Sequence, residues 1–211
     1  MFDAVIFDLD GTLIDTERLS LAAGLVAFDQ MGHPVDAAFL HGLVGRDQVT
    51  GGGLIRSRFP GLDIAALDTL WMAAVDAIMA REGLPLKPGV KDLLGRLMLP
   101  CAIATSSGRL RAHQKLALTG LDPWFRHVVT LEDVTQAKPH PEAYLLAAAR
   151  LGVDPARCVA FEDSETGAQS AHRAGMRVVQ VPDLLPTQGR WAHHVCADLL
   201  SGARLAGLIA D

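Results

Sequence analysis

Short apolar runs alternate with stretches of helical periodicity along most of this chain. Uninterrupted apolar segments that end in polar residues or glycine suit strands buried on both faces of a parallel sheet. We expect such strands at 4–7, 101–104, 158–161 and 178–181, with a weaker candidate at 127–130. Helical periodicity between them predicts helices at 90–98, 110–118, 141–151 and 166–174. This alternation predicts right-handed crossovers and an α/β fold with a Rossmann-like parallel sheet.

One stretch interrupts the alternation. From residue 17 to residue 82 the pattern is helical, with long helices expected at 17–31 and 62–81 and shorter ones at 36–43 and 47–59. We therefore predict a helical-bundle domain over 16–85, inserted into an α/β core made of 1–15 and 86–211. Linkers at both ends of the insert would let it move as a lid. The triple glycine at 51–53 costs helix stability, so we expect a break or a flexible turn there.

Composition and charge narrow the possible partners. The chain has 211 residues and a formal net charge of −5, and its 19 Lys and Arg residues form no basic run, so we expect no nucleic-acid partner. No leader pattern and no apolar run of roughly 18 residues is present, which predicts that the protein does not enter a membrane. Cys101, Cys158 and Cys196 are widely spaced and suit free thiols in a reducing compartment. We expect a cytoplasmic monomer.

Polar residues follow the predicted strands, at the edge where open α/β sheets place their sites. The first strand is followed by Asp8 and Asp10, and Gly11 then permits a sharp turn. Two carboxylates this close repel each other unless a cation lies between them or one of them binds a proton. For this pair alone, a solvated aspartate-rich turn remains an alternative.

The other strand ends supply complementary groups. Residues 105–108, Thr-Ser-Ser-Gly, offer hydroxyl and N–H donors that suit an oxyanion, although Ser and Thr also serve as ordinary helix caps. Lys138 stands in a proline-rich loop ahead of a predicted helix. Glu162 and Asp163 directly follow a buried strand, and paired acids favour Mg²⁺ over zinc.

In their order and position, these clusters resemble the motifs of the haloacid dehalogenase superfamily, in the branch with a helical cap inserted after the first motif. The resemblance runs from Phe7 to about Pro182 and rests on four motifs: Phe7-Asp8-Leu9-Asp10-Gly11-Thr12-Leu13, Thr105, Lys138-Pro139-His140-Pro141-Glu142 and Phe161-Glu162-Asp163-Ser164.

The resemblance implies catalytic roles. Asp8 would attack phosphorus and become an aspartyl-phosphate. Asp10 would protonate the leaving alkoxide and then deprotonate the incoming hydroxyl, which requires it to hold a proton near Asp8. Lys138 would neutralise charge on the phosphoryl group, and Thr105 would bond one of its oxygens.

The resemblance also implies the binding groups. The substrate would be a small phosphorylated metabolite, contacted by Ser106 and Ser107. The cofactor would be Mg²⁺. Its ligands would be the carboxylates of Asp8, Glu162 and Asp163 and the backbone carbonyl of Asp10.

The choice of substrate is harder to predict. The presence of Asp10 argues against the haloacid dehalogenases themselves, which lack that acid and need no metal. The chain also resembles β-phosphoglucomutase, but Ser20 stands where that enzyme's cap histidine is expected, and Gly108 replaces its substrate-contacting Lys or Asn. Thr12 is more typical of phosphatases. Arg46 could bind a second phosphate or be a solvated residue at a helix start.

We therefore expect a Mg²⁺-dependent phosphatase that hydrolyses a small sugar or polyol phosphate. A phosphosugar mutase of the β-phosphoglucomutase type is one alternative. A non-enzymatic protein that binds phosphometabolites is another, although such a protein would be expected to lose Asp8, Asp10 or Lys138.

Overall fold

The computed structural model of this chain describes residues 1–43 and 48–210, with only the backbone described at 48–50. The chain divides into two compact units, a larger one of residues 1–15 and 84–211 and a smaller one of residues 16–83. Every described helix is too short or too polar to cross a membrane.

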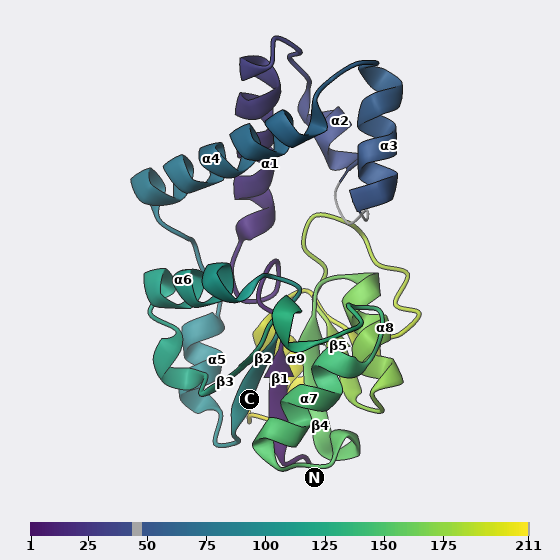
Figure 1. The fold of residues 1–211 in the computed structure, drawn as a ribbon. Helices are drawn as coiled ribbons and strands as arrows, with labels where there is room; N and C mark the ends of the chain where they lie inside the picture. The colour runs from purple at the N-terminus through teal and green to yellow at the C-terminus, as the bar shows by residue number, and fades with distance from the viewer. Residues whose placement is uncertain (44–47, 211) are drawn as a thin grey trace. The chain divides into compact units, whose positions relative to one another are not determined.

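The described part of the larger unit contains a six-stranded sheet in which all neighbouring strands are parallel, in the order β3-β2-β1-β4-β5-β6 (Figure 1). Its strands are β1 (Ala4–Phe7), β2 (Cys101–Ala104), β3 (His127–Val129), β4 (Cys158–Glu162), β5 (Arg177–Gln180) and β6 (His194–Val195). The prediction of an α/β fold with a parallel sheet is confirmed. The two-residue strand β6 was not predicted.

Helices cover both faces of this sheet, which explains the uninterrupted apolar runs. In β1, Val5 and Phe7 face one core cluster, while Ala4 and Ile6 face the other. The first cluster is completed by α5 (Val90–Arg96), α6 (Arg109–Thr119) and α9 (Leu199–Leu205). The second is completed by α7 (Glu142–Leu151) and α8 (Glu165–Arg173). Short 3-10 turns lie at Asp122–Trp124, Leu131–Asp133 and Pro155–Arg157.

The smaller unit is helical. It contains α1 (Thr16–Gln30), α2 (Ala37–His41), α3 (Gln48–Arg58) and α4 (Ile64–Glu82). Phe28 lies at the centre of its core, with ring centroids 5.7 Å from Phe39, 5.6 Å from Phe59 and 6.0 Å from Trp71. This unit therefore has an apolar core of its own.

The expected break at the triple glycine is wrong. Gly51, Gly52 and Gly53 all lie within α3. Each glycine costs a helix about 1 kcal/mol relative to alanine, but α3 also places Ile55 in the apolar core of the smaller unit. Packing of one helix face therefore outweighs the unfavourable local propensity.

Candidate active site

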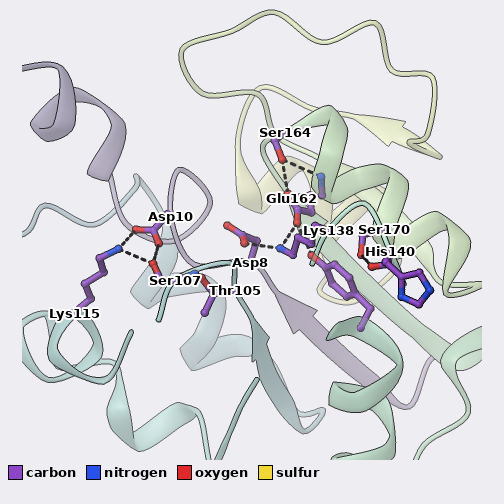
Figure 2. Close-up of polar contacts among 12 residues, drawn as sticks. Asp8, Asp10, Thr105, Ser107, Lys115, Lys138, His140, Glu162, Ser164 and Ser170 are labelled. Atoms are coloured by element: carbon purple, nitrogen blue, oxygen red, sulfur yellow. Dashed lines mark hydrogen bonds and ion pairs between the residues drawn. The ribbon is translucent and has the colours of Figure 1, made fainter. Parts of the chain in front are cut away.

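The predicted polar clusters lie at the carboxyl ends of three adjacent inner strands, β2, β1 and β4. Asp8 and Asp10 follow β1, Thr105 follows β2, and Glu162 ends β4. Since β2, β1 and β4 are adjacent and parallel, their ends deliver these side chains to one edge of the sheet (Figure 2). Lys138 reaches the same edge from the loop before α7.

Lys138 joins the acids that follow β1 and β4. Its Nζ lies 2.7 Å from Asp8 Oδ1 and 2.6 Å from Glu162 Oε1 (Figure 2). All three side chains are at most 9% exposed, so this ion-pair network is shielded from water. Glu162 also accepts hydrogen bonds from the hydroxyl of Tyr144 at 2.7 Å and from that of Ser164 at 3.2 Å.

Burial and neighbouring charge shift the protonation equilibria of this network. Burial, together with the neighbouring acids Glu162 and Asp10, raises the pKa of Asp8 to about 7 against the opposing effect of Lys138. For Lys138, burial alone would lower the pKa, but Asp8 and Glu162 raise it above its ordinary value. Lys138 therefore stays protonated and positively charged beside acids that repel one another.

Two glycines make room for the acids at the end of β4, Glu162 and Asp163. A Cβ on Gly11, whose φ is +79°, would lie 2.4 Å from Asp163 Oδ2. A Cβ on Gly167 would lie 1.9 Å from Glu162 Oε1. Any side chain at either position would displace a carboxylate, so close approach requires both glycines, and the positive φ of Gly11 favours glycine there as well.

The residues present fit a hard divalent cation. Asp8, Glu162 and Asp163 each offer a carboxylate oxygen, and these atoms lie within 4.8 Å of one another. The single ammonium group of Lys138 balances only one of these three negative charges. An all-oxygen donor set that is partly buried and anionic suits Mg²⁺. The ligand group does not include the Asp10 side chain, for which we had predicted a metal contact only through the backbone carbonyl.

Thr105 and Ser107 form a hydrogen-bonded turn after β2. The Thr105 N–H donates to the Val129 carbonyl at 2.9 Å, which extends the β2–β3 ladder. The Ser107 N–H in turn donates to Thr105 Oγ1 at 3.0 Å. Thr105 is buried, whereas Ser106 is exposed in the same turn.

Asp10 points toward a lysine that the sequence argument missed. Lys115 Nζ lies 2.6 Å from Asp10 Oδ1, and the Ser107 hydroxyl donates to Asp10 Oδ2 at 2.6 Å (Figure 2). Ser107, predicted to contact substrate, thus contacts Asp10 in this structure. These two donors use one lone pair on each oxygen of Asp10, so each oxygen keeps a further lone pair that can bind a proton.

Tyr144 was also missed, although it is the single tyrosine of the chain. It is fully buried on α7, and Lys138 Nζ lies 5.0 Å from the centre of its ring. Burial, together with the charge of Glu162, raises the pKa of the Tyr144 hydroxyl well above its ordinary value. Tyr144 therefore stays neutral and donates its proton to Glu162.

Three of the residues that bear on substrate choice are Arg46, Ser20 and Gly108, and the structure describes the latter two. Arg46 lies outside the described residues. Ser20 belongs to the smaller unit, where its carbonyl accepts a hydrogen bond from Trp71 Nε1 at 3.0 Å. A Cβ on Gly108 would lie 3.0 Å from Glu132 Oε1, so the carboxylate of Glu132 fills the space that a side chain at 108 would need.

Comparison with known proteins shows where this site belongs. Residues 2–175 match the family model of haloacid dehalogenase-like hydrolases. The chain belongs to this family. The resemblance inferred from the four motifs is thereby confirmed, and so is the prediction of an enzyme that hydrolyses phosphoric monoesters.

Among its relatives, this haloacid dehalogenase-like hydrolase is 36% identical over 183 residues to fructose-1-phosphate phosphatase YqaB of Escherichia coli (strain K12), with 85% of this chain and 96% of that protein covered. Hexitol phosphatase B of the same organism is 31% identical over 202 residues, with coverages of 85% and 83%. A solved structure of a CbbY variant from Rhodobacter sphaeroides in complex with xylulose-1,5-bisphosphate matches with a TM-score of 0.79 and 26% identity over the full length of both chains.

Proposed function

We propose that this phosphoric monoester hydrolase is a Mg²⁺-dependent phosphatase that acts on a small sugar or polyol phosphate through an aspartyl-phosphate on Asp8. The observation that carries the proposal is the buried Asp8, paired with Lys138 beside Glu162 and Asp163. The activities for which the two phosphatase relatives are named, on fructose 1-phosphate and on hexitol phosphates, support the substrate class.

In the first step, a carboxylate oxygen of Asp8 attacks phosphorus. A bond forms between this oxygen and phosphorus, and the bond from phosphorus to the alcohol oxygen breaks. Asp10 donates a proton to the departing oxygen. Lys138 offsets the repulsion between the Asp8 carboxylate and the phosphoryl group, because its charge is fixed in contact with Asp8.

In the second step, the oxygen of a water molecule attacks the phosphorus of the aspartyl-phosphate. The bond between phosphorus and Asp8 breaks, Asp10 takes the proton of the water, and inorganic phosphate leaves. Asp8 and Asp10 thereby return to their starting states, so one turnover consumes one ester and one water.

The proposed cofactor is Mg²⁺, held by the carboxylates of Asp8, Glu162 and Asp163 and by the Asp10 carbonyl. When bound, it would polarise the phosphoryl oxygens and neutralise charge that develops on them. Of the carboxylates, Glu162 already accepts hydrogen bonds from Lys138, Tyr144 and Ser164, so it also fixes the ammonium group of Lys138.

We propose that the turn after β2 binds the phosphoryl group. A hydroxyl both accepts and donates. Thr105 Oγ1 accepts from the Ser107 N–H, and its own proton is directed to a phosphoryl oxygen in this proposal. Ser106, exposed in the same turn, and Ser107 complete the proposed binding group.

The helical domain over 16–85 is proposed to act as a lid that selects the alcohol portion of the substrate, with Arg46 as a contact. We further propose that the protein is a cytoplasmic monomer. The three cysteines are free thiols, which suits a reducing compartment. Size-exclusion chromatography with light scattering checks the monomeric state.

Release of inorganic phosphate from a panel of esters tests the proposed function. The panel contains fructose 1-phosphate, hexitol phosphates and other small sugar phosphates, each with and without Mg²⁺. We expect Mg²⁺-dependent hydrolysis of at least one ester and no turnover by Asp8→Asn. Folded wild-type protein that binds Mg²⁺ yet hydrolyses none of them would contradict the proposal.

One further assay separates phosphatase from phosphomutase. With β-glucose 1-phosphate and a trace of the bisphosphate, a phosphatase releases inorganic phosphate, whereas a mutase forms glucose 6-phosphate. We expect release of phosphate, because Gly108 offers no side chain to a second phosphate and Glu132 lies beside it. Rapid formation of glucose 6-phosphate would reverse this assignment.

A further inference from the structure

Lys115 lies on α6, next to the face of the helix that packs into the core. In α6, Ala112, Leu116 and Thr119 are buried, and Lys115 borders this stripe with a side chain that is only 14% exposed. An ammonium group turned inward from such a position needs an anionic partner. Here the partner is Asp10, at 2.6 Å.

Asp10, Lys115 and Ser107 form a closed triangle of contacts (Figure 2). Lys115 Nζ contacts Asp10 Oδ1 and lies 3.0 Å from Ser107 Oγ, and the Ser107 hydroxyl donates to Asp10 Oδ2 at 2.6 Å. Each carboxylate oxygen thus has its own donor, and the two donors are bonded to each other. This arrangement fixes the rotation of the Asp10 carboxylate, which a single hydrogen bond would not do.

This triangle is separate from the network around Asp8. Lys138 is bonded to Asp8 and Glu162, whereas Lys115 is bonded to Asp10 and Ser107. The chain therefore uses two of its four lysines in the site, one beside the nucleophile and the other beside the proposed proton donor.

We propose that Lys115 is a positioning residue that, together with Ser107, orients the Asp10 carboxylate toward the oxygen of the departing alcohol. The inference rests on the proposed function, in which Asp10 moves that proton. Misorientation of a proton donor slows the departure of a poor leaving group, which needs the proton, much more than that of a good one, which does not.

The test compares two substrates in the same enzyme preparation. One is an alkyl phosphate from the panel, and the other is p-nitrophenyl phosphate, whose leaving group departs as a stable anion. The measured quantity is kcat/KM, which reports the steps up to release of the alcohol. Lys115→Met and Lys115→Gln remove the charge and retain good helix formers. Lys91→Met, at an exposed position of α5, is the matched control.

We expect both Lys115 variants to lower kcat/KM for the alkyl phosphate by about 100-fold. The loss for p-nitrophenyl phosphate should be at least about tenfold smaller. The ratio of the two values does not depend on how much of a variant is folded. An equal loss on both substrates, or no loss on either, would overturn the role of Lys115. If the proposed function itself fails, wild type and Lys91→Met hydrolyse neither ester.

Discussion

Lys138 and Asp8 form a buried ion pair whose Nζ and Oδ1 atoms lie 2.7 Å apart, with side chains only 6% and 9% exposed. The same ammonium group contacts Glu162 at 2.6 Å. One cation thus connects the proposed nucleophile at the end of β1 with the acids at the end of β4. The site therefore depends on charges that cannot be removed singly without leaving a partner uncompensated.

Replacing Lys138 by alanine should abolish most of the activity. We expect a fall in kcat of at least about 100-fold, because no other described group contacts Asp8 with a positive charge in this site. The two buried acids left behind should also lower the free energy of unfolding by roughly 3 kcal/mol. Steady-state kinetics and urea unfolding measure the two effects, with Lys91→Ala as the control. Loss of stability with an unchanged rate per folded molecule would contradict the assigned role.

Replacing Asp163 by asparagine should weaken Mg²⁺ binding. Asp163 is the least buried member of the carboxylate group, and asparagine keeps its shape while removing one negative charge. Isothermal titration should show an affinity reduced by about tenfold or more. The exposed Asp92 on α5 provides the control, and Asp92→Asn should bind Mg²⁺ as the wild type does. Equal affinities in all three proteins would exclude Asp163 from the metal site.

Alanine should have opposite effects at two helical glycines. At Gly53 in α3, a Cβ meets nothing within 4 Å, so alanine should stabilise the protein by up to about 1 kcal/mol. At Gly167 in α8, a Cβ would lie 1.9 Å from Glu162 Oε1, so alanine should destabilise the fold and lower kcat. Thermal unfolding and phosphate release measure both variants. Stabilisation by Gly167→Ala without loss of activity would contradict the close packing of Glu162.

Asp133 should make the stability of the protein sensitive to acid. Burial opposes its ionisation, but hydrogen bonds from Arg150 and Thr130 outweigh burial and lower the pKa of Asp133 well below its ordinary value. Because the folded-state pKa is the lower one, ionised Asp133 stabilises the fold above about pH 4. This contribution is lost as the pH falls toward the folded-state pKa.

We therefore expect Asp133→Asn to lower the free energy of unfolding at pH 7 by about 2 kcal/mol. The difference from wild type should shrink between about pH 4 and pH 2. Urea unfolding at several pH values measures it, with Asp92→Asn as the control. A difference that stays constant down to pH 2 would show that the hydrogen bonds to Asp133 do not depend on its charge.

The core strands and the motif residues could be predicted from the sequence because their signals are local. β1 is buried on both faces and therefore appears as an uninterrupted apolar run, and Asp8, Glu162 and Lys138 stand at fixed positions beside strands or prolines. β6, with two residues, is too short to leave a periodic signal. The triple glycine predicted a break that is not observed, because tertiary packing stabilises α3 as a helix despite the low helix propensity of glycine.

Lys115 and Tyr144 could not be found by motif spacing, since Lys115 reaches the site from the middle of α6 and Tyr144 from the first turn of α7. A weaker signal existed for both. Lys115 borders the buried positions Ala112 and Leu116, and Tyr144 lies on the buried face of α7. A polar group on a predicted core face indicates that it has a polar partner elsewhere in the chain. Which residue that partner is depends on the order of the strands in the sheet.

The most direct test of the account is detection of the phosphoryl group on Asp8. Wild-type protein is mixed with Mg²⁺ and a substrate from the panel, quenched with acid during the first turnover, and the peptide that contains residue 8 is examined by mass spectrometry, with Asp8→Asn treated in parallel. We expect one phosphoryl group on Asp8 in the wild type and none in the variant, which should not turn over. A phosphoryl group on another residue, or phosphate release by Asp8→Asn at the wild-type rate, would contradict it.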